Sequence, residues 1–278
     1  AAFRRDPTAF RVVETADGDV RFTACGRDPY FPPWTDVAQL DYSNPDTRAA
    51  MVAELDRLSQ HADGARCDMA MLALSDVFRE TWKGYLRSPM PATEFWTDAR
   101  SAVPSFVLLA EVYWDLEWRL QQLGFDFTYD KQLYDRLRHS SAADVRGHLT
   151  ADPDYQRRSA RFIENHDEPR SAAEFGDRVQ AAAVVISTLP GLRFFYQGQF
   201  EGRTKHLPVQ LGRWSDEAAN EDSERFYERL LAAVNDDVFH AGEWRLLDVH
   251  PAGDGSTSDL LAWQWLCEGE IRGELRIV

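Results

Sequence analysis

The sequence predicts an α/β fold in which helices cover a parallel sheet. Five short apolar segments with strand character alternate with helical segments, and they begin near residues 64, 105, 125, 161 and 192. This alternation is typical of a parallel sheet with helices outside it. After residue 244 the helices stop, and apolar and polar residues alternate as they do in strands. We therefore expect a partial (β/α)8 TIM barrel, about its last five strand–helix units, followed by the start of a C-terminal β domain.

The domain boundary is expected near residue 243. Residues 1–243 would form the partial barrel, with an irregular N-terminal segment at 1–42 that lacks helical periodicity and contains Asp28-Pro29 and Pro32-Pro33. Residues 244–278 would begin a β-sandwich-like domain. A closed barrel needs eight strand–helix units, so we expect a fragment that lacks the first three. An open sheet has exposed edges, and such a fragment is expected to be poorly stable by itself.

Local signals place the first elements. Ser43 or Asn44 can cap a helix that has Pro45 at its first position, and apolar residues follow at helical spacing. A strand at 64–69 comes next, followed by helical material to about residue 86. The first parallel strand is therefore expected between two helical segments.

Proline and glycine delimit the elements that follow. Pro91 begins a helix and Pro104 ends it, and the run 105–110 is apolar after its first residue, as in a strand covered on both faces. A helix at 114–123 stops at Gly124. The remaining predicted elements are a strand at 125–129, helices around Leu133 and Val145, a strand at 161–164, a helix at 173–189, a strand at 192–196 and a helix at 224–234.

The composition argues against several classes of partner. The 278 residues carry a net charge of −15, whereas nucleic acids and anionic membranes are bound through clusters of Lys and Arg. No apolar stretch is long enough for a membrane span. Cys25, Cys67 and Cys267 show no ligand or disulfide pattern, and Cys67 is expected to be a small buried hydrophobe. The lack of a disulfide pattern favours a cytoplasmic setting. The first residues are not a natural start, so the localisation stays unassigned. The sequence does not indicate the oligomeric state.

Acidic residues stand where three predicted strands end. Asp68, Glu111 and Asp167 each lie at or just beyond an apolar strand, and Asp167 belongs to a polar cluster at 164–170 that follows Phe162-Ile163. Desolvating charges is costly unless they are paired or used, and the carboxyl ends of barrel strands carry catalytic groups. One such acid alone would be a helix cap or a salt-bridge partner. Three on one parallel sheet indicate a shared site.

Three carboxylates that meet at the carboxyl ends of the strands can cleave a glycosidic bond. When two are held about 5 to 5.5 Å apart, one attacks the anomeric carbon while the other, kept protonated, donates to the leaving oxygen. A third can stabilise the distorted sugar and its positive charge. The three acids are therefore compatible with retaining glycoside hydrolysis.

Three stretches at these strand ends resemble conserved stretches of the α-amylase family of glycoside hydrolases, glycoside hydrolase family 13. They are Gly64–Asp68, Ala110–Trp114 and Phe162–Asp167, and Asp36–Asp41 is similar to a weaker stretch before the fourth barrel strand. The resemblance covers about residues 28–243, and the stretches appear in the same order as in the family. Three matched stretches in that order are a more specific signal than any one of them alone. It implies the C-terminal portion of the family's catalytic barrel.

The resemblance implies a role for each acid. Asp68 would be the nucleophile, Glu111 the general acid/base, and Asp167 would grip the hydroxyls of the sugar at the cleavage point. Arg66, on the same strand face as Asp68, would keep that carboxylate ionised and oriented. His166 would hydrogen-bond the same sugar as Asp167. The alternatives are a structural ion pair for Arg66 and a capping role for His166.

Further substrate-binding candidates lie beside the acids. They are Asn165, Tyr113 and Trp114. An aromatic ring can stack on a sugar face or pack in the core, and both interpretations also apply to Tyr30, Phe31 and Trp34. Lys205 and His206 would line the mouth after the last strand.

The sequence departs from the family in three places. Met71 and Leu72 stand where many amylases have Lys-His, and Gly198–Glu201 has one residue more than the family's Gly-Gln-Glu. The family's conserved Asp and Asn-His at the third strand are absent from this chain, and with them part of the usual calcium site. No metal ligand or cofactor is therefore predicted here, while calcium is possible in the full-length protein.

The combined prediction is a retaining α-glycosidase that hydrolyses α-glucosidic bonds in α-glucans or oligosaccharides by double displacement. Two alternatives stay open. One is an α-glucan transglycosylase, such as a glucanotransferase or a sucrose- or trehalose-acting enzyme. The other is a non-catalytic, amylase-like binding subunit, which the presence of all three acids disfavours.

Overall fold

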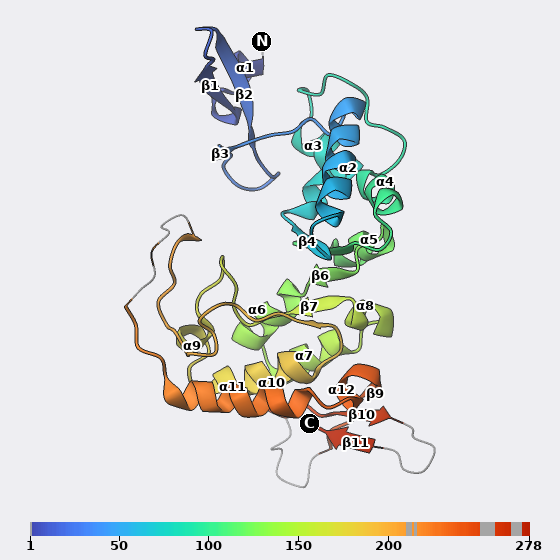
Figure 1. Ribbon diagram of the computed structural model, residues 1–278, viewed down its shortest axis with the longest axis vertical. Coiled ribbons are helices and arrows are strands. Elements are labelled where there is room, and N and C mark those ends of the chain that lie inside the picture. The colour runs from blue at the N-terminus through green and yellow to red at the C-terminus, as the bar shows by residue number, and fades with distance from the viewer. Residues whose placement is uncertain (1, 210–212, 214–215, 251–258, 268–273) are drawn as a thin grey trace. The chain divides into compact units, whose positions relative to one another are not determined.

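The computed structural model describes residues 2–209, 213, 216–250, 259–267 and 274–278 (Figure 1). It divides into two compact units, Ala1–Asp126 and Phe127–Val278. Each unit contains parallel strands alternating with helices, and each also contains an antiparallel sheet of three strands. The α/β class predicted from the alternation is therefore confirmed. The described strands do not form a closed barrel.

An antiparallel sheet lies within residues 1–42, where an irregular segment was expected. After α1 (Ala2–Arg5) the chain forms β1 (Phe10–Glu14), β2 (Val20–Gly26) and β3 (Trp34–Ala38), in the order β1-β2-β3. Most side chains of β1 and β3 are exposed, and much of β2 is too. A strand without a buried face has no reason to alternate apolar and polar residues, so the pattern that reveals strands is missing. The expectation of an irregular segment was wrong for this reason.

The first unit also contains the first two parallel strands. Its elements are α2 (Pro45–Ser59), β4 (Gly64–Cys67), η2 (Ala70–Ala73), α3 (Ser75–Thr81), α4 (Phe95–Ala102), β5 (Val107–Ala110) and α5 (Glu117–Gln122). Asn44 caps α2 as predicted, because its side chain accepts a hydrogen bond from the Asp46 amide. The two strands pair in parallel, with Gly64 opposite Val107. Helix α5 begins three residues later than expected, since Trp114 and Asp115 have φ angles of 65° and 60° and cannot be helical.

The second unit continues the pattern with three more parallel strands. Its elements are β6 (Phe127–Tyr129), α6 (Lys131–His139), α7 (Ala142–Leu149), α8 (Pro153–Arg157), β7 (Ser159–Arg161), α9 (Ser171–Glu174), η3 (Gly176–Arg178), α10 (Val179–Thr188), β8 (Leu192–Arg193), α11 (Glu221–Val234) and α12 (Val238–Ala241). Thr128 pairs with Ser159, and Ala160 pairs with Leu192. In Figure 1, α11 lies along α10. All predicted strands are present, although β7 ends before Phe162 and β8 is only two residues long.

The last three described strands form an antiparallel sheet within the second unit. Strands β9 (Glu243–Leu246), β10 (Trp263–Cys267) and β11 (Glu274–Ile277) form an antiparallel sheet in the order β11-β10-β9. Trp263 and Trp265 are buried in one core with residues of α6, α7 and α10. The Trp265 indole donates to the Thr188 carbonyl at 2.6 Å. This sheet therefore packs directly on the helices of its unit, and a separate β-sandwich-like domain stays a prediction.

A buried ion pair joins the strands of the second unit. Arg161, on β7, lies 3.0 Å from Asp130 at the end of β6, and His148 Nε2 lies 2.9 Å from the other oxygen of Asp130. All three side chains are almost completely buried. Such a pair is tolerated because each charge is hydrogen-bonded. Across the described part of the chain, no helix combines the length and apolar character that crossing a membrane requires.

Candidate active site

Two acids lie side by side at the carboxyl ends of β4 and β5. The parallel register pairs Cys67 with Ala110, so the next residues, Asp68 and Glu111, leave their strands at the same end. The ladder continues one step further, because the Glu111 amide donates to the Cys67 carbonyl at 3.0 Å. Strand pairing alone therefore brings these two acids together from distant parts of the sequence.

Arg66 contacts both acids. Its Nη1 lies 2.5 Å from Asp68 Oδ1, and its Nη2 lies 2.7 Å from Glu111 Oε2. Residues two apart in a strand share a face, which is why Arg66 can reach Asp68. The planar guanidinium holds two carboxylates in a fixed relation, whereas a flexible ammonium acts as a point charge. One side chain thus orients both acids.

Glu111 is buried and hydrogen-bonded through both oxygens. It is 4% exposed; Oε2 accepts from the Met69 amide at 2.9 Å, and Oε1 accepts from the Tyr113 hydroxyl at 2.8 Å. Burial raises the pKa of the Glu111 carboxyl above its usual value, while the Met69 amide, the Tyr113 hydroxyl and Arg66 oppose that rise. A carboxyl whose pKa is raised stays protonated to higher pH, as a general acid requires.

Asp68 has the opposite surroundings. Its side chain is 77% exposed, and Arg66 is the cation beside it. An exposed carboxylate can approach a bound substrate directly. Two carboxyl groups in contrasting environments can divide a reaction between them, the buried one as proton donor and the exposed one as nucleophile.

Backbone strain is concentrated beside these acids. Among the described residues other than glycine, positive φ angles occur only at Met69, Trp114 and Asp115, with values of 43°, 65° and 60°. Met69 follows Asp68 directly, and Trp114 comes three residues after Glu111. Such angles are unfavourable for bulky side chains and persist only where the surroundings fix them, which happens most often at functional sites.

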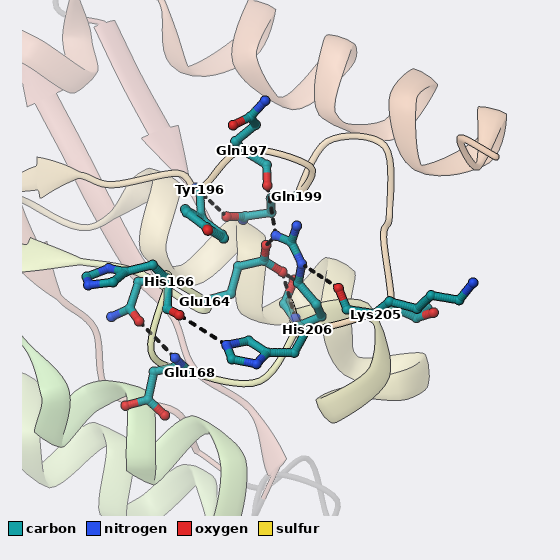
Figure 2. A network of polar contacts seen from close by, with 12 residues as sticks. Glu164, His166, Glu168, Tyr196, Gln197, Gln199, Lys205 and His206 are labelled. Atoms are coloured by element: carbon teal, nitrogen blue, oxygen red, sulfur yellow. Dashed lines mark hydrogen bonds and ion pairs between the residues drawn. The ribbon is translucent and has the colours of Figure 1, made fainter. Parts of the chain in front are cut away.

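The turn after β7, in the second unit, holds another group of predicted residues. Asn165 Oδ1 accepts hydrogen bonds from the amides of Asp167 and Glu168 at 2.8 and 2.9 Å, which closes an Asx turn. His166 Nε2 lies 3.0 Å from Asp167 Oδ2, and both side chains are partly exposed. Figure 2 shows this turn from close by, with His166 and Glu168 labelled.

A buried ion pair anchors this turn. Glu164 Oε1 lies 2.5 Å from Arg170 Nη1, and Oε2 accepts from the Ser171 amide and hydroxyl, both at 2.6 Å. Glu164 and Arg170 are both buried. The two residues bracket the turn, so the positions of His166 and Asp167 depend on this pair.

Arg170 also holds the segment after β8 beside the same turn (Figure 2). Its Nη1 donates to the Gln197 carbonyl at 2.8 Å, and its Nε donates to the Lys205 carbonyl at 3.4 Å. His206 Nε2 lies 3.0 Å from the His166 carbonyl oxygen. Lys205 and His206, which were expected to line the mouth, therefore lie next to the turn that carries His166.

The predicted site residues fall into two groups. Arg66, Asp68, Glu111 and Tyr113 are in contact in the first unit, with Trp114 on the same turn as Tyr113; Asn165, His166 and Asp167 are in contact in the second unit. Convergence of all three acids on one mouth stays a prediction.

Three residues of these groups were not singled out from the sequence. Glu164 and Arg170 had only their place in the polar cluster 164–170 as a signal. Met69 acts through its backbone amide, for which its side chain offers no signal.

The described residues include no cluster of three or more His, Cys, Asp or Glu side chains suited to a metal ion.

The chain matches known proteins over most of its length. Residues 34–248 match the family description "Alpha amylase, catalytic domain". A curated relative, α-amylase MalA of Haloarcula japonica, is 25% identical over 96% of this chain and 40% of its own length. The chain thus spans less than half of that relative.

Solved structures show the same fold. The maltogenic α-amylase AmyB from Thermotoga neapolitana aligns with a TM-score of 0.64 and 21% identity, over 94% of this chain and 57% of that one. The cyclic α-maltosyl-(1→6)-maltose hydrolase from Arthrobacter globiformis aligns with a TM-score of 0.65 and 18% identity, over 97% of this chain and 60% of that one. Since the catalytic-domain match spans residues 34–248, this protein belongs to the α-amylase family of glycoside hydrolases.

Proposed function

We propose that the protein is a retaining α-glycosidase that acts on α-glucans or α-linked oligosaccharides. The observation that carries this proposal is the shared contact of Arg66 with Asp68 and Glu111, one exposed and one buried carboxyl group. Family membership supports the substrate class, and names such as maltogenic α-amylase among similar structures agree with it. A retaining mechanism needs two such carboxyl groups close together.

In the first step, Glu111 acts as the acid and Asp68 as the nucleophile. The Glu111 proton passes to the glycosidic oxygen while an Asp68 oxygen bonds to the anomeric carbon. The bond between that carbon and the glycosidic oxygen breaks, and the departing sugar leaves with a new hydroxyl. Arg66 holds the Asp68 carboxylate in place for this attack through their contact at 2.5 Å.

In the second step, Glu111 acts as the base. Its carboxylate takes a proton from water, the water oxygen attacks the anomeric carbon, and the ester to Asp68 breaks. Two inversions give a product with the original α configuration. If a sugar hydroxyl replaces the water, the same step is a transglycosylation.

The turn after β7 supplies the sugar contacts in this proposal. Asp167 accepts hydrogen bonds from sugar hydroxyls, and His166 donates to the same sugar. Asn165 fixes the turn through its two amide contacts, so it acts on the sugar only through its neighbours. Hydrogen bonds of this kind strengthen as the sugar distorts toward its transition state.

The test uses the protein at its full natural length with maltopentaose as substrate. We expect the first product to be the α anomer, seen by proton NMR before it mutarotates. Glu111→Gln should lower kcat about 10²- to 10⁴-fold, because the proton donor is lost. The exposed Glu80→Gln is the matched control and should keep wild-type turnover. A β-anomeric first product, or unchanged turnover in Glu111→Gln, would contradict the proposal.

Analysis of product length separates hydrolysis from transfer. Hydrolysis of maltopentaose gives only shorter chains, whereas a glucanotransferase also gives chains longer than the substrate. Binding of maltopentaose without any turnover by the wild type would identify a non-catalytic binding subunit instead.

A further inference from the structure

An ion-pair network joins helix α6 to the turn that carries Asp167. Lys131 Nζ lies 3.3 Å from Glu168 Oε1, and Arg138 Nη1 lies 3.9 Å from Glu168 Oε2. Glu168 follows Asp167 directly in the sequence and is labelled in Figure 2. Two cations from one helix therefore hold the residue that adjoins the proposed sugar contact.

Water reaches this network only in part. The side chains of Lys131, Arg138 and Glu168 are 21%, 16% and 14% exposed. An ion pair on the open surface contributes little because water and salt screen it, whereas a partly buried pair is screened much less. The side chain of Asp167, by contrast, is 52% exposed. The network thus fixes the turn through Glu168 and leaves Asp167 accessible to a ligand.

The helix that supplies the cations is itself fixed at its first residues. Its N-cap residue, Asp130, is buried, accepts from the Leu133 amide at 3.0 Å and pairs with Arg161 of β7. Lys131 is the first residue of α6 and so follows the carboxyl end of β6, the parallel neighbour of β7. Because parallel strands end at the same edge of a sheet, Lys131 can reach the turn after β7.

The ring of Tyr134 restricts both cations. Lys131 Nζ lies 4.8 Å from the centroid of this ring, and Arg138 Cζ lies 5.1 Å from it. Tyr134 is completely buried and stacks on Phe162, with 5.4 Å between the centroids and 27° between the planes. An aromatic face attracts a cation, so the ring limits the conformations of two long side chains. Both charges are therefore placed beside the turn before any sugar binds, which reduces the cost of ordering it.

We propose that Lys131 is a positioning residue for the reaction and that it acts through Glu168 on Asp167. This inference rests on the proposed function, in which Asp167 accepts hydrogen bonds from the sugar. Such hydrogen bonds strengthen as the sugar distorts toward its transition state. A displaced Asp167 therefore loses stabilisation of the transition state more than binding of the substrate. The Lys131 ammonium acts on the turn and not on the sugar.

The test uses the protein at its full natural length with maltopentaose as substrate. Lys131→Met keeps an unbranched side chain and removes its charge. It should lower kcat and kcat/KM about tenfold and leave KM within about twofold, as expected for an interaction made only in the transition state. Asp135→Asn is the matched control, because Asp135 is the other carboxylate beside Lys131, at 2.6 Å on the same helix, and kcat should not change. An ion pair that only stabilised the fold would leave the kcat of folded Lys131→Met unchanged.

A double-mutant cycle tests whether Lys131 acts through Glu168. Glu168→Gln should also lower kcat about tenfold, and the double variant should lose no more than the larger single loss, since both changes remove the same contact. A wild type that does not cleave maltopentaose would refute the proposed function. With an active wild type, only the positioning role is refuted by unchanged kcat in Lys131→Met, by an equal loss in Asp135→Asn, or by losses that multiply in the double variant. If Lys131→Met does not fold, Glu168→Gln compared with Asp135→Asn decides by the same criterion.

Discussion

Arg66 Nη2 lies 2.7 Å from Glu111 Oε2, so the guanidinium of a strand residue touches the proposed proton donor as well as the nucleophile that follows it. This contact couples the two carboxyl groups. Any change in the geometry of Arg66 moves both acids, and any change in its charge alters the electrostatic surroundings of both. The prediction for Arg66→Lys rests on this relation.

Arg66→Lys should preserve the fold and lower kcat about 100-fold. A lysine ammonium is a point charge on a flexible stem and cannot hold two carboxylates with one planar fork. A displacement of about 1 Å between reacting groups is enough for a loss of that size. Steady-state kinetics on maltopentaose measure the effect. Arg57→Lys, which alters an exposed ion pair with Glu54 on α2, is the control and should keep wild-type kcat. Wild-type kcat in Arg66→Lys would show that the shared contact is not needed.

Tyr113→Phe should move the alkaline limb of the kcat/KM profile to higher pH. Glu111 must be protonated for the first step, so activity falls as the pH rises through its pKa. The Tyr113 hydroxyl stabilises the carboxylate form and so lowers the pKa of Glu111, against the rise caused by burial. Removing the hydroxyl therefore raises that pKa further. The acid limb of the same profile is the internal control, and a limb that moves to lower pH would disprove this role of Tyr113.

Arg170→Leu should lower the free energy of unfolding by about 3–5 kcal/mol, because it leaves the carboxylate of Glu164 buried without its partner. Chemical denaturation of the full-length protein measures the loss. The double variant Glu164→Leu with Arg170→Leu should lose less than the sum of the single variants, since neither charge is left alone. Arg225→Leu removes exposed ion pairs on α11 and should cause no measurable loss. Equal losses for Arg170→Leu and Arg225→Leu would be inconsistent with an anchoring role for the buried pair.

Cys67 should not react with alkylating reagents at pH 8, although it directly precedes Asp68. Burial raises the pKa of its thiol to about 12, so almost no thiolate is present at that pH. Peptide mass spectrometry after brief treatment with iodoacetamide should find Cys67 unmodified in the folded protein and modified after unfolding. Rapid alkylation in the folded state would contradict the raised pKa of this half-buried thiol.

The strand ends were predictable because they depend on local patterns and on strand pairing. An apolar run marks β5, and parallel pairing of β4 with β5 then forces Asp68 and Glu111 to the same end. The position of Arg66 follows from the two-residue period of a strand. These parts need no knowledge of distant packing.

Other parts could not be predicted, for identifiable physical reasons. The strands within 10–38 have few buried side chains and so lack the alternation that reveals a strand. Trp114 fits a helical pattern by composition, but its φ of 65° is imposed by the surrounding turn. The pairing of Glu164 with Arg170 depends on how the chain folds back after β7, which residue types alone do not specify.

The most direct measurement of the central claim is to trap the covalent intermediate on Asp68. In Glu111→Gln, a maltosyl fluoride substrate needs no acid to depart, so the first step proceeds, while the second step lacks its base and is slow. Mass spectrometry of the intact protein should then show the mass of one maltosyl unit added. Peptide mapping should place that unit on Asp68. A maltosyl unit on any other residue, or release of product without any trapped intermediate, would contradict the assignment of Asp68 and Glu111 as nucleophile and acid/base.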